Sequence, residues 1–244
     1  DDEANAETLY GRLAVTTTGE QQAEAYLQVG RLALERGDVR QAESAFSSAA
    51  AAAPDSYFSA RAQDIRDGRA PFTPPDEYVF EFDDLAEVTA AENWLRQTFG
   101  AGRELPEGPL WPLSPELEAE PRVVRGRELW AVGAFNEAIT EFLDVMGDYR
   151  EDGIASYQLA IYTRIIGAYY PSIVGAANVI QAAGVATLEA PPYIARMRYP
   201  AYYRDVILRI TSARDVDPLL MMSLIRHESL FNAYATAAAD EKGL

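Results

Sequence analysis

The sequence predicts an all-α fold built from stacked helical hairpins, and two observations indicate it. Strong helix formers (Ala, Leu, Gln, Glu and Arg) dominate residues 21–53, which are interrupted at residues 36–38 and end at Pro54. Two helices separated by a glycine turn form an antiparallel hairpin. The same spacing of small and aromatic residues then returns later in the chain.

Each predicted hairpin has small residues where its helices meet and an aromatic side chain between them. The first copy consists of Gly30, Ala33, Gly37, Ala42 and Phe46, and the second of Gly126, Leu129, Gly133, Ala138 and Phe142. Residues 157–180, with Gly167 as the turn, form a third and weaker copy. This pattern resembles the tetratricopeptide repeat, whose period is about 34 residues and whose hairpins stack into a superhelix. An irregular helical bundle is the alternative.

Less regular sequence separates the copies. Asp84 and Glu87 form the pattern of a capping box, which predicts a helix that Gly100 closes. Residues 78–82 alternate aromatic and polar side chains, which favours an extended segment without an evident partner strand. Residues 103–121 contain five prolines and therefore predict a connector that runs over other elements.

Composition excludes several classes of protein. The chain has 244 residues, no cysteine and one histidine, so disulfides, thiolate sites and multi-histidine metal centres are excluded. The net charge of −17 makes nucleic acid an unfavourable partner. We also find no apolar run long enough for a membrane span.

Charge is distributed unevenly along the chain. Residues 190–244 hold seven basic and six acidic groups, a net charge of +1, whereas the preceding residues have 14 − 32 = −18. This difference predicts a helical-repeat domain over residues 1–190 and a second domain over residues 191–244. A solvated acidic surface on the front part is the alternative interpretation.

The candidate chemistry lies in the second domain. Asp217 and Pro218 predict a helix start, and the helix then carries an apolar stripe of Met221, Leu224 and Ile225 that continues to Glu228. We expect this stripe to face the core. Burying a carboxylate is costly unless it is paired or protonated, and a protonated glutamate can act as a general acid. A helix-end glutamate paired with an arginine is the alternative.

Residues 224–235, Leu-Ile-Arg-His-Glu-Ser-Leu-Phe-Asn-Ala-Tyr-Ala, are followed at a distance by Gly243-Leu244. This pattern resembles the goose-lysozyme-like domain of the soluble lytic transglycosylases. One departure is Ala237, where the family commonly has serine. The helical front is similar to the superhelical region that precedes this domain in the family. The resemblance implies an all-α chain in which stacked hairpins are followed by the first helices of a lysozyme-like domain.

The resemblance also implies an activity and its residues. Glu228 would be the catalytic acid and base, Ser229 and Asn232 would support it, and neither metal nor organic cofactor is implied. His227 is interpreted as a flanking residue, and Asp240 and Glu241 match no catalytic position. The implied substrate is the glycan strand of peptidoglycan, cleaved between N-acetylmuramic acid and N-acetylglucosamine to leave a 1,6-anhydro ring.

Further expectations follow from that resemblance. Peptidoglycan implies an extracytoplasmic location in the cell envelope, with the signal sequence missing from this chain. The family's domain continues after Gly-Leu, so we expect residues 191–244 to be an incomplete domain and the chain to lack turnover on its own. Two alternatives remain open, a hydrolytic muramidase and a helical-repeat scaffold that binds a protein partner and carries a vestigial enzyme segment.

Overall fold

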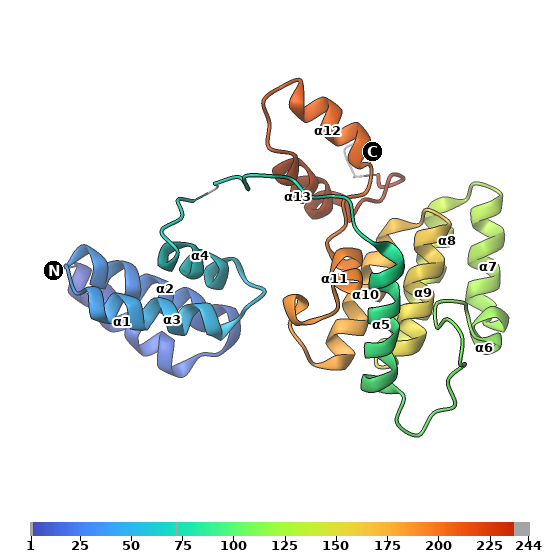
Figure 1. Cartoon of the computed structure of the whole chain (residues 1–244), viewed down its shortest axis with the longest axis horizontal. Helices are drawn as coiled ribbons and strands as arrows, with labels where there is room; N and C mark the ends of the chain where they lie inside the picture. Colours follow the sequence, from blue (N-terminus) through green and yellow to red (C-terminus); the bar gives the residue numbers. More distant parts are fainter. Residues whose placement is uncertain (1, 72, 237–244) are drawn as a thin grey trace. The chain divides into compact units, whose positions relative to one another are not determined.

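The computed structural model describes residues 2–71 and 73–236, and all its regular elements are helical (Figure 1). The described residues form thirteen α-helices and one short 3₁₀ helix, and they contain no β-strand, which confirms the predicted all-α class. The chain divides into two compact units, residues 1–78 and 79–244. The boundary expected at residue 190 rests on the charge distribution along the sequence and not on compactness. It stays a prediction.

The first unit is a row of four antiparallel helices. They are α1 (Asp2–Thr16), α2 (Gly19–Glu35), α3 (Val39–Ala52) and α4 (Tyr57–Arg66). Helix α2 packs between α1 and α3, and α4 covers α2 and α3. The core between them consists mainly of small side chains around two large ones: Leu27, Ala33, Ala42, Phe46, Ala49 and Ala62. Small residues allow the helix axes to lie close together.

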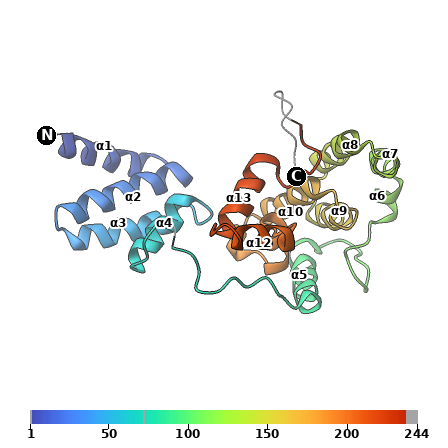
Figure 2. The same cartoon turned by 90° about the horizontal axis from the view of Figure 1, so that it is seen from above.

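The second unit contains two further hairpins and the helices that cover them. Its elements are α5 (Asp84–Phe99), α6 (Pro115–Ala119), α7 (Pro121–Ala131), α8 (Phe135–Asp148), α9 (Gly153–Ile165), α10 (Tyr169–Ala183), η1 (Thr187–Glu189), α11 (Pro192–Arg198), α12 (Arg204–Ser212) and α13 (Pro218–Ser229). Helices α7 with α8 and α9 with α10 form the hairpins, which Figure 2 shows side by side. Helix α5 packs on α9 and α11. Of the helices in the described residues, none is long and apolar enough to cross a membrane.

Three hairpins use the same turn. Gly37, Gly133 and Gly167 have φ of +84°, +81° and +85°, a region in which other residues are strained. In each turn, the amide after the glycine donates to the carbonyl five residues earlier, over 2.8–2.9 Å. This is the Schellman pattern of a helix end. The second and third turns are 167 − 133 = 34 residues apart, so the weak third copy is also a hairpin.

A glycine facing a phenylalanine ring sets the spacing of two hairpins. A Cβ added to Gly30 would lie 2.5 Å from the Phe46 ring, and one added to Gly126 would lie 2.6 Å from the Phe142 ring. Both rings are buried. The third hairpin reverses the arrangement, because its glycine, Gly175, is on the second helix and faces Ala160. The predicted register therefore holds for two copies and changes in the third.

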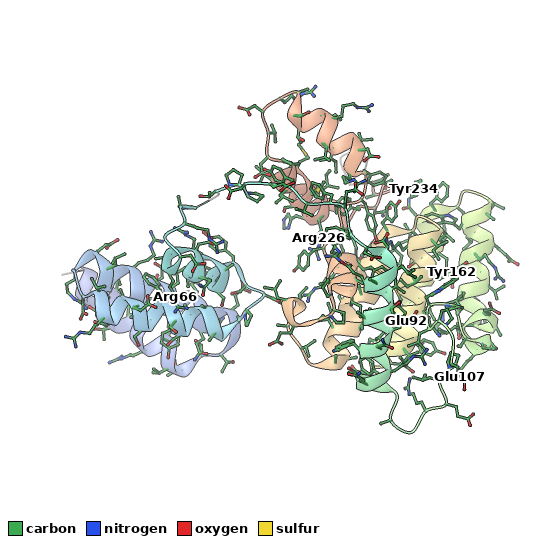
Figure 3. The ribbon with its side chains drawn as sticks, in the orientation of Figure 1. Arg66, Glu92, Glu107, Tyr162, Arg226 and Tyr234 are labelled. Atoms are coloured by element: carbon green, nitrogen blue, oxygen red, sulfur yellow. The ribbon has the colours of Figure 1, made fainter. Side chains whose placement is uncertain are left out.

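Buried polar side chains hold the proline-rich connector to the second unit. Glu92 of α5, which is labelled in Figure 3, accepts hydrogen bonds from the Trp111 backbone amide at 3.1 Å and the Tyr157 hydroxyl at 3.3 Å. Burial and the nearby Glu92 carboxylate raise the pKa of the Tyr157 hydroxyl, so it remains a donor. Gln158 donates to the Leu110 carbonyl at 3.0 Å. Residues 103–121 thus run over α5 and α9, as the prolines predict.

One predicted helix start is shifted. Asp83, not Asp84, is the N-cap of α5, and its side chain accepts from the Ala86 amide at 3.0 Å. Glu87 instead forms an ion pair with Arg196 of α11. The sequence pattern is ambiguous because adjacent aspartates can each cap a helix.

The close glycine–phenylalanine contact generates a stability prediction. We expect Gly126→Ala to lower the free energy of unfolding by about 1–3 kcal/mol, because the fully buried Phe142 ring must move and its neighbours must repack. Urea denaturation followed by circular dichroism measures the change. Gly147→Ala in α8 is the matched control, since nothing lies within 4 Å of its added Cβ, and it should leave stability unchanged or higher by up to about 1 kcal/mol. Equal midpoints for both variants would contradict this explanation.

Candidate active site

Helix α13 presents the candidate catalytic residue, and its ends are well defined. The Asp217 side chain accepts from the Leu219 amide at 2.8 Å, and Pro218 occupies the first helical position, as predicted. The helix ends where Leu230 and Phe231 adopt left-handed φ values of +49° and +58°. Each such residue costs about 1–2 kcal/mol, so other contacts must hold this turn.

The Phe231 side chain supplies those contacts. It is 1% exposed and lies perpendicular to the Tyr202 ring, with centroids 5.6 Å apart. Tyr202 in turn stacks on Tyr169 at 3.8 Å, at the first residue of α10. Ile173, Ile207 and Met222 complete the same core. This aromatic cluster joins the end of α13 to the start of α10.

The structure overturns the expectation that Glu228 faces the core. Glu228 is exposed, and Leu224 on the same face is 52% exposed. The buried positions of α13 are instead Pro218 and Met222. Met221 and Ile225 of the predicted stripe do pack against the core that contains Met222 and Phe231, whereas Leu224 and Glu228 lie outside it. Among the described residues, none forms a hydrogen bond or ion pair with Glu228, so the alternative of a glutamate paired with an arginine is not seen there either.

Ser229 and Asn232 lie together in the turn that follows Glu228. The Ser229 hydroxyl donates to the Ile225 carbonyl at 3.1 Å. The Asn232 backbone N–H donates to the Ser229 carbonyl at 2.9 Å. The Asn232 side-chain oxygen accepts from the Tyr234 backbone N–H at 3.0 Å. In this structure both residues shape the backbone beside Glu228.

Tyr234 attaches this turn to the α7–α8 hairpin (Figure 3). Its ring stacks on Phe135 with centroids 3.9 Å apart and packs edge-on against Trp130 at 5.7 Å. Sequence reasoning missed this contact, because Phe135 and Tyr234 are distant in the chain and neither belongs to a periodic apolar face. The turn is therefore held at both ends, by the packing of Phe231 on Tyr202 and by the stacking of Tyr234 on Phe135.

The end of the expected family pattern, with Ala237, Gly243 and Leu244, lies outside the described part of the chain. Asp240 and Glu241, which match no catalytic position, lie outside it too. Within the described part, no group of three or more His, Cys, Asp or Glu side chains is placed to hold a metal ion.

A cavity of about 460 Å³ lies on another side of α13. Leu219, Met222, Ser223 and Arg226 contribute to its wall, and Glu228, Ser229 and Asn232 do not. Residues 226 and 228 are about 200° apart around a helix axis. The second unit therefore presents Glu228 and this cavity on different faces.

Comparison with known proteins adds no assignment to these residues. No protein-family model matches the sequence, and the search of curated proteins found no match. A functional assignment must therefore be argued from the residues of α13 and its following turn.

The aromatic cluster generates a prediction about local stability. Phe231→Ala should destabilise α12 and α13 by about 3–5 kcal/mol, because it removes a fully buried ring from the cluster. Hydrogen exchange measured by mass spectrometry should show faster exchange of the α13 amides. Leu224→Ala is the matched control on the same helix, and because Leu224 is exposed its effect should stay within about 0.5 kcal/mol. Unchanged exchange in Phe231→Ala would show that the ring does not hold the helix.

Proposed function

We propose that this protein is a lytic transglycosylase that cleaves the glycan strands of peptidoglycan, with Glu228 as its single acid and base. The observation that carries the proposal is the segment at residues 224–235, in which Glu228 and Ser229 are followed by Phe231 and Asn232. Such a substrate would place the work of the protein in the cell envelope.

The geometry of the turn supports this proposal. Glu228 is accessible at the C-terminal end of α13, so a bound sugar could reach its carboxyl group. The buried Phe231 and the backbone bonds of Ser229 and Asn232 hold the following turn in a strained conformation. Strained backbone that is held by its surroundings clusters at functional sites. Leu220 and Leu224, which are 64% and 52% exposed, extend the accessible face beside Glu228 and offer apolar surface to a sugar ring.

The proposed reaction uses one carboxyl group twice. Glu228 first donates its proton to the glycosidic oxygen as the bond to the anomeric carbon of N-acetylmuramic acid breaks. The resulting carboxylate then removes the proton of the 6-hydroxyl of that sugar, and the freed oxygen bonds to the anomeric carbon. Glu228 regains its proton, no water is consumed, and the product carries a 1,6-anhydro ring.

Two other functions use the same structure differently. A hydrolytic muramidase shares the general acid, but water attacks the anomeric carbon. A scaffold that binds a protein partner is favoured by the repeated hairpins, since stacked hairpins present an extended surface. The products of the reaction separate these alternatives.

The principal test is substitution of the proposed acid. In the full product of the gene, Glu228→Gln should lower the release of muropeptides from peptidoglycan by at least about 10²-fold, because the amide keeps the shape and loses the transferable proton. Mass spectrometry should show wild-type products with sugar ends one water lighter than hydrolysis gives. Glu128→Gln is the matched control, since Glu128 is an exposed glutamate of α7 in the same unit.

Three results would contradict the proposal. Full activity of Glu228→Gln would remove Glu228 from the mechanism. Hydrated reducing ends would identify a muramidase. No release by the full wild-type product, with normal helix content, would favour the scaffold.

The open face around Glu228 generates a separate prediction for the 244-residue chain. Positioning of a substrate supplies a large share of enzymatic rate, and within the described residues the face of Leu220, Leu224 and Glu228 has no opposing wall. We therefore expect residues 1–244 to release no anhydro-muropeptides above the Glu228→Gln background in the same assay. Clear turnover that depends on Glu228 would mean that this chain itself supplies the opposing wall.

A further inference from the structure

The cavity beside α13 is built from three parts of the second unit. Its walls come from residues 79–82 with Asp84 at the start of α5, from α11 and the residues after it up to Arg204 at the start of α12, and from α13, with Arg164 of α9 added. Its volume of about 460 Å³ lies within the usual range for sites that hold small molecules. The proposed catalytic residues do not contribute to it.

The cavity concentrates positive charge in an acidic protein. Four arginines line it, against one carboxylate, Asp84, in a chain whose net charge is −17. Two of these arginines have carboxylate partners, because Arg196 pairs with Glu87, and Arg204 lies 3.3 Å from both Glu81 and Asp205. The other two are Arg164 and Arg226, and within the described part of the chain neither has a carboxylate at ion-pair distance.

Arg226 is held in place while part of its guanidinium stays available. Its Nε donates to the Arg198 carbonyl at 3.1 Å, which ties α13 to α11 (Figure 3). Its guanidinium carbon lies 4.2 Å from the centre of the Tyr199 ring. No hydrogen bond is formed by its two terminal nitrogens within the described residues. Burial lowers the pKa of the Arg226 guanidinium because it disfavours the charged form, and an anion bound beside it would act in the opposite direction.

Arg164, which also lines the cavity, is oriented by an aromatic partner. It donates to the Tyr193 hydroxyl at 3.1 Å, and its guanidinium carbon lies 5.4 Å from the centre of the same ring. Aromatic and apolar side chains fill the rest of the lining, among them Phe80, Met197 and Tyr202. The cavity therefore combines two cations that lack carboxylate partners with walls suited to an apolar or aromatic body.

We propose that this cavity binds a small organic monocarboxylate whose body is apolar or aromatic, with the carboxylate held by Arg226 and Arg164. A planar guanidinium matches the two oxygens of a carboxylate, and charge-assisted hydrogen bonds of this kind are about twice as strong as neutral ones. Asp84, which also lines the cavity, repels a dianion such as phosphate more strongly than a monoanion. The proposal does not rest on transglycosylase activity, because Glu228 lies on another face.

Calorimetric titration with two probes of equal shape tests the ligand class. N-acetylphenylalanine carries the carboxylate, and N-acetylphenylalaninamide lacks the charge. We expect the acid to bind at least about tenfold more tightly than the amide, the scale of a lost charge-assisted hydrogen bond. Inorganic phosphate is the third probe and should bind more weakly than the acid. Equal affinity of acid and amide, tighter binding of phosphate, or no binding of the acid would each overturn the proposal.

Variants test the site itself. Arg226→Gln should weaken binding of N-acetylphenylalanine at least about tenfold, whereas Arg209→Gln, an exposed arginine of α12 outside the cavity, should bind like wild type. Ser223→Phe provides a second variant, because Ser223 is exposed at the cavity wall and a phenyl ring there fills the space without entering the core. Glu228→Gln should leave this affinity unchanged. Wild-type affinity in Ser223→Phe and Arg226→Gln would show that the probe binds elsewhere.

Discussion

Burial of Phe231 is the interaction on which the functional part of this structure depends. The ring packs among Tyr202, Tyr203 and the core residue Met222, and it offsets two consecutive left-handed residues at the end of α13. A helix that is anchored at one end by a large side chain has a defined rotation about its axis. That rotation places Glu228 outside and Arg226 in the wall of a cavity, so one packing contact sets both candidate sites.

The hairpin scaffold positions this anchor. Gly167 makes the turn that starts α10 at Tyr169, and Tyr169 stacks on Tyr202, which contacts Phe231. A second attachment runs through Tyr234 to the α7–α8 hairpin. The repeated hairpins therefore do more than form a surface, because they hold the segment around Glu228 at two points. This arrangement links the stability of the repeats to the geometry of the proposed active site.

Electrostatics distinguish the two candidate sites. Glu228 is exposed and has no ion-pair partner among the described residues. Arg226 is half-buried among aromatic rings, where burial strengthens its interaction with any anion. A cavity lined by four arginines contrasts with the net charge of −17 of the whole chain. The candidate catalytic carboxylate and the arginine-lined cavity thus lie on different faces of the same helix.

The sequence by itself determined the features that depend on neighbours in the chain. The all-α class, the glycine turns at residues 37, 133 and 167, the capping of α13 by Asp217 and the course of the proline-rich connector could all be predicted, because propensity, capping and turn geometry are local. The candidate residue Glu228 was also named from a local pattern. Its exposure was predicted wrongly, since Met221 and Ile225 of the predicted stripe pack against the core but Glu228 does not, and the rotation of α13 depends on contacts with distant residues. The tertiary structure alone also brought Arg164 and Arg226 into one cavity and Tyr234 onto Phe135. These pairs are separated by many residues, and long-range packing, which leaves no periodic signal in a sequence, decides them.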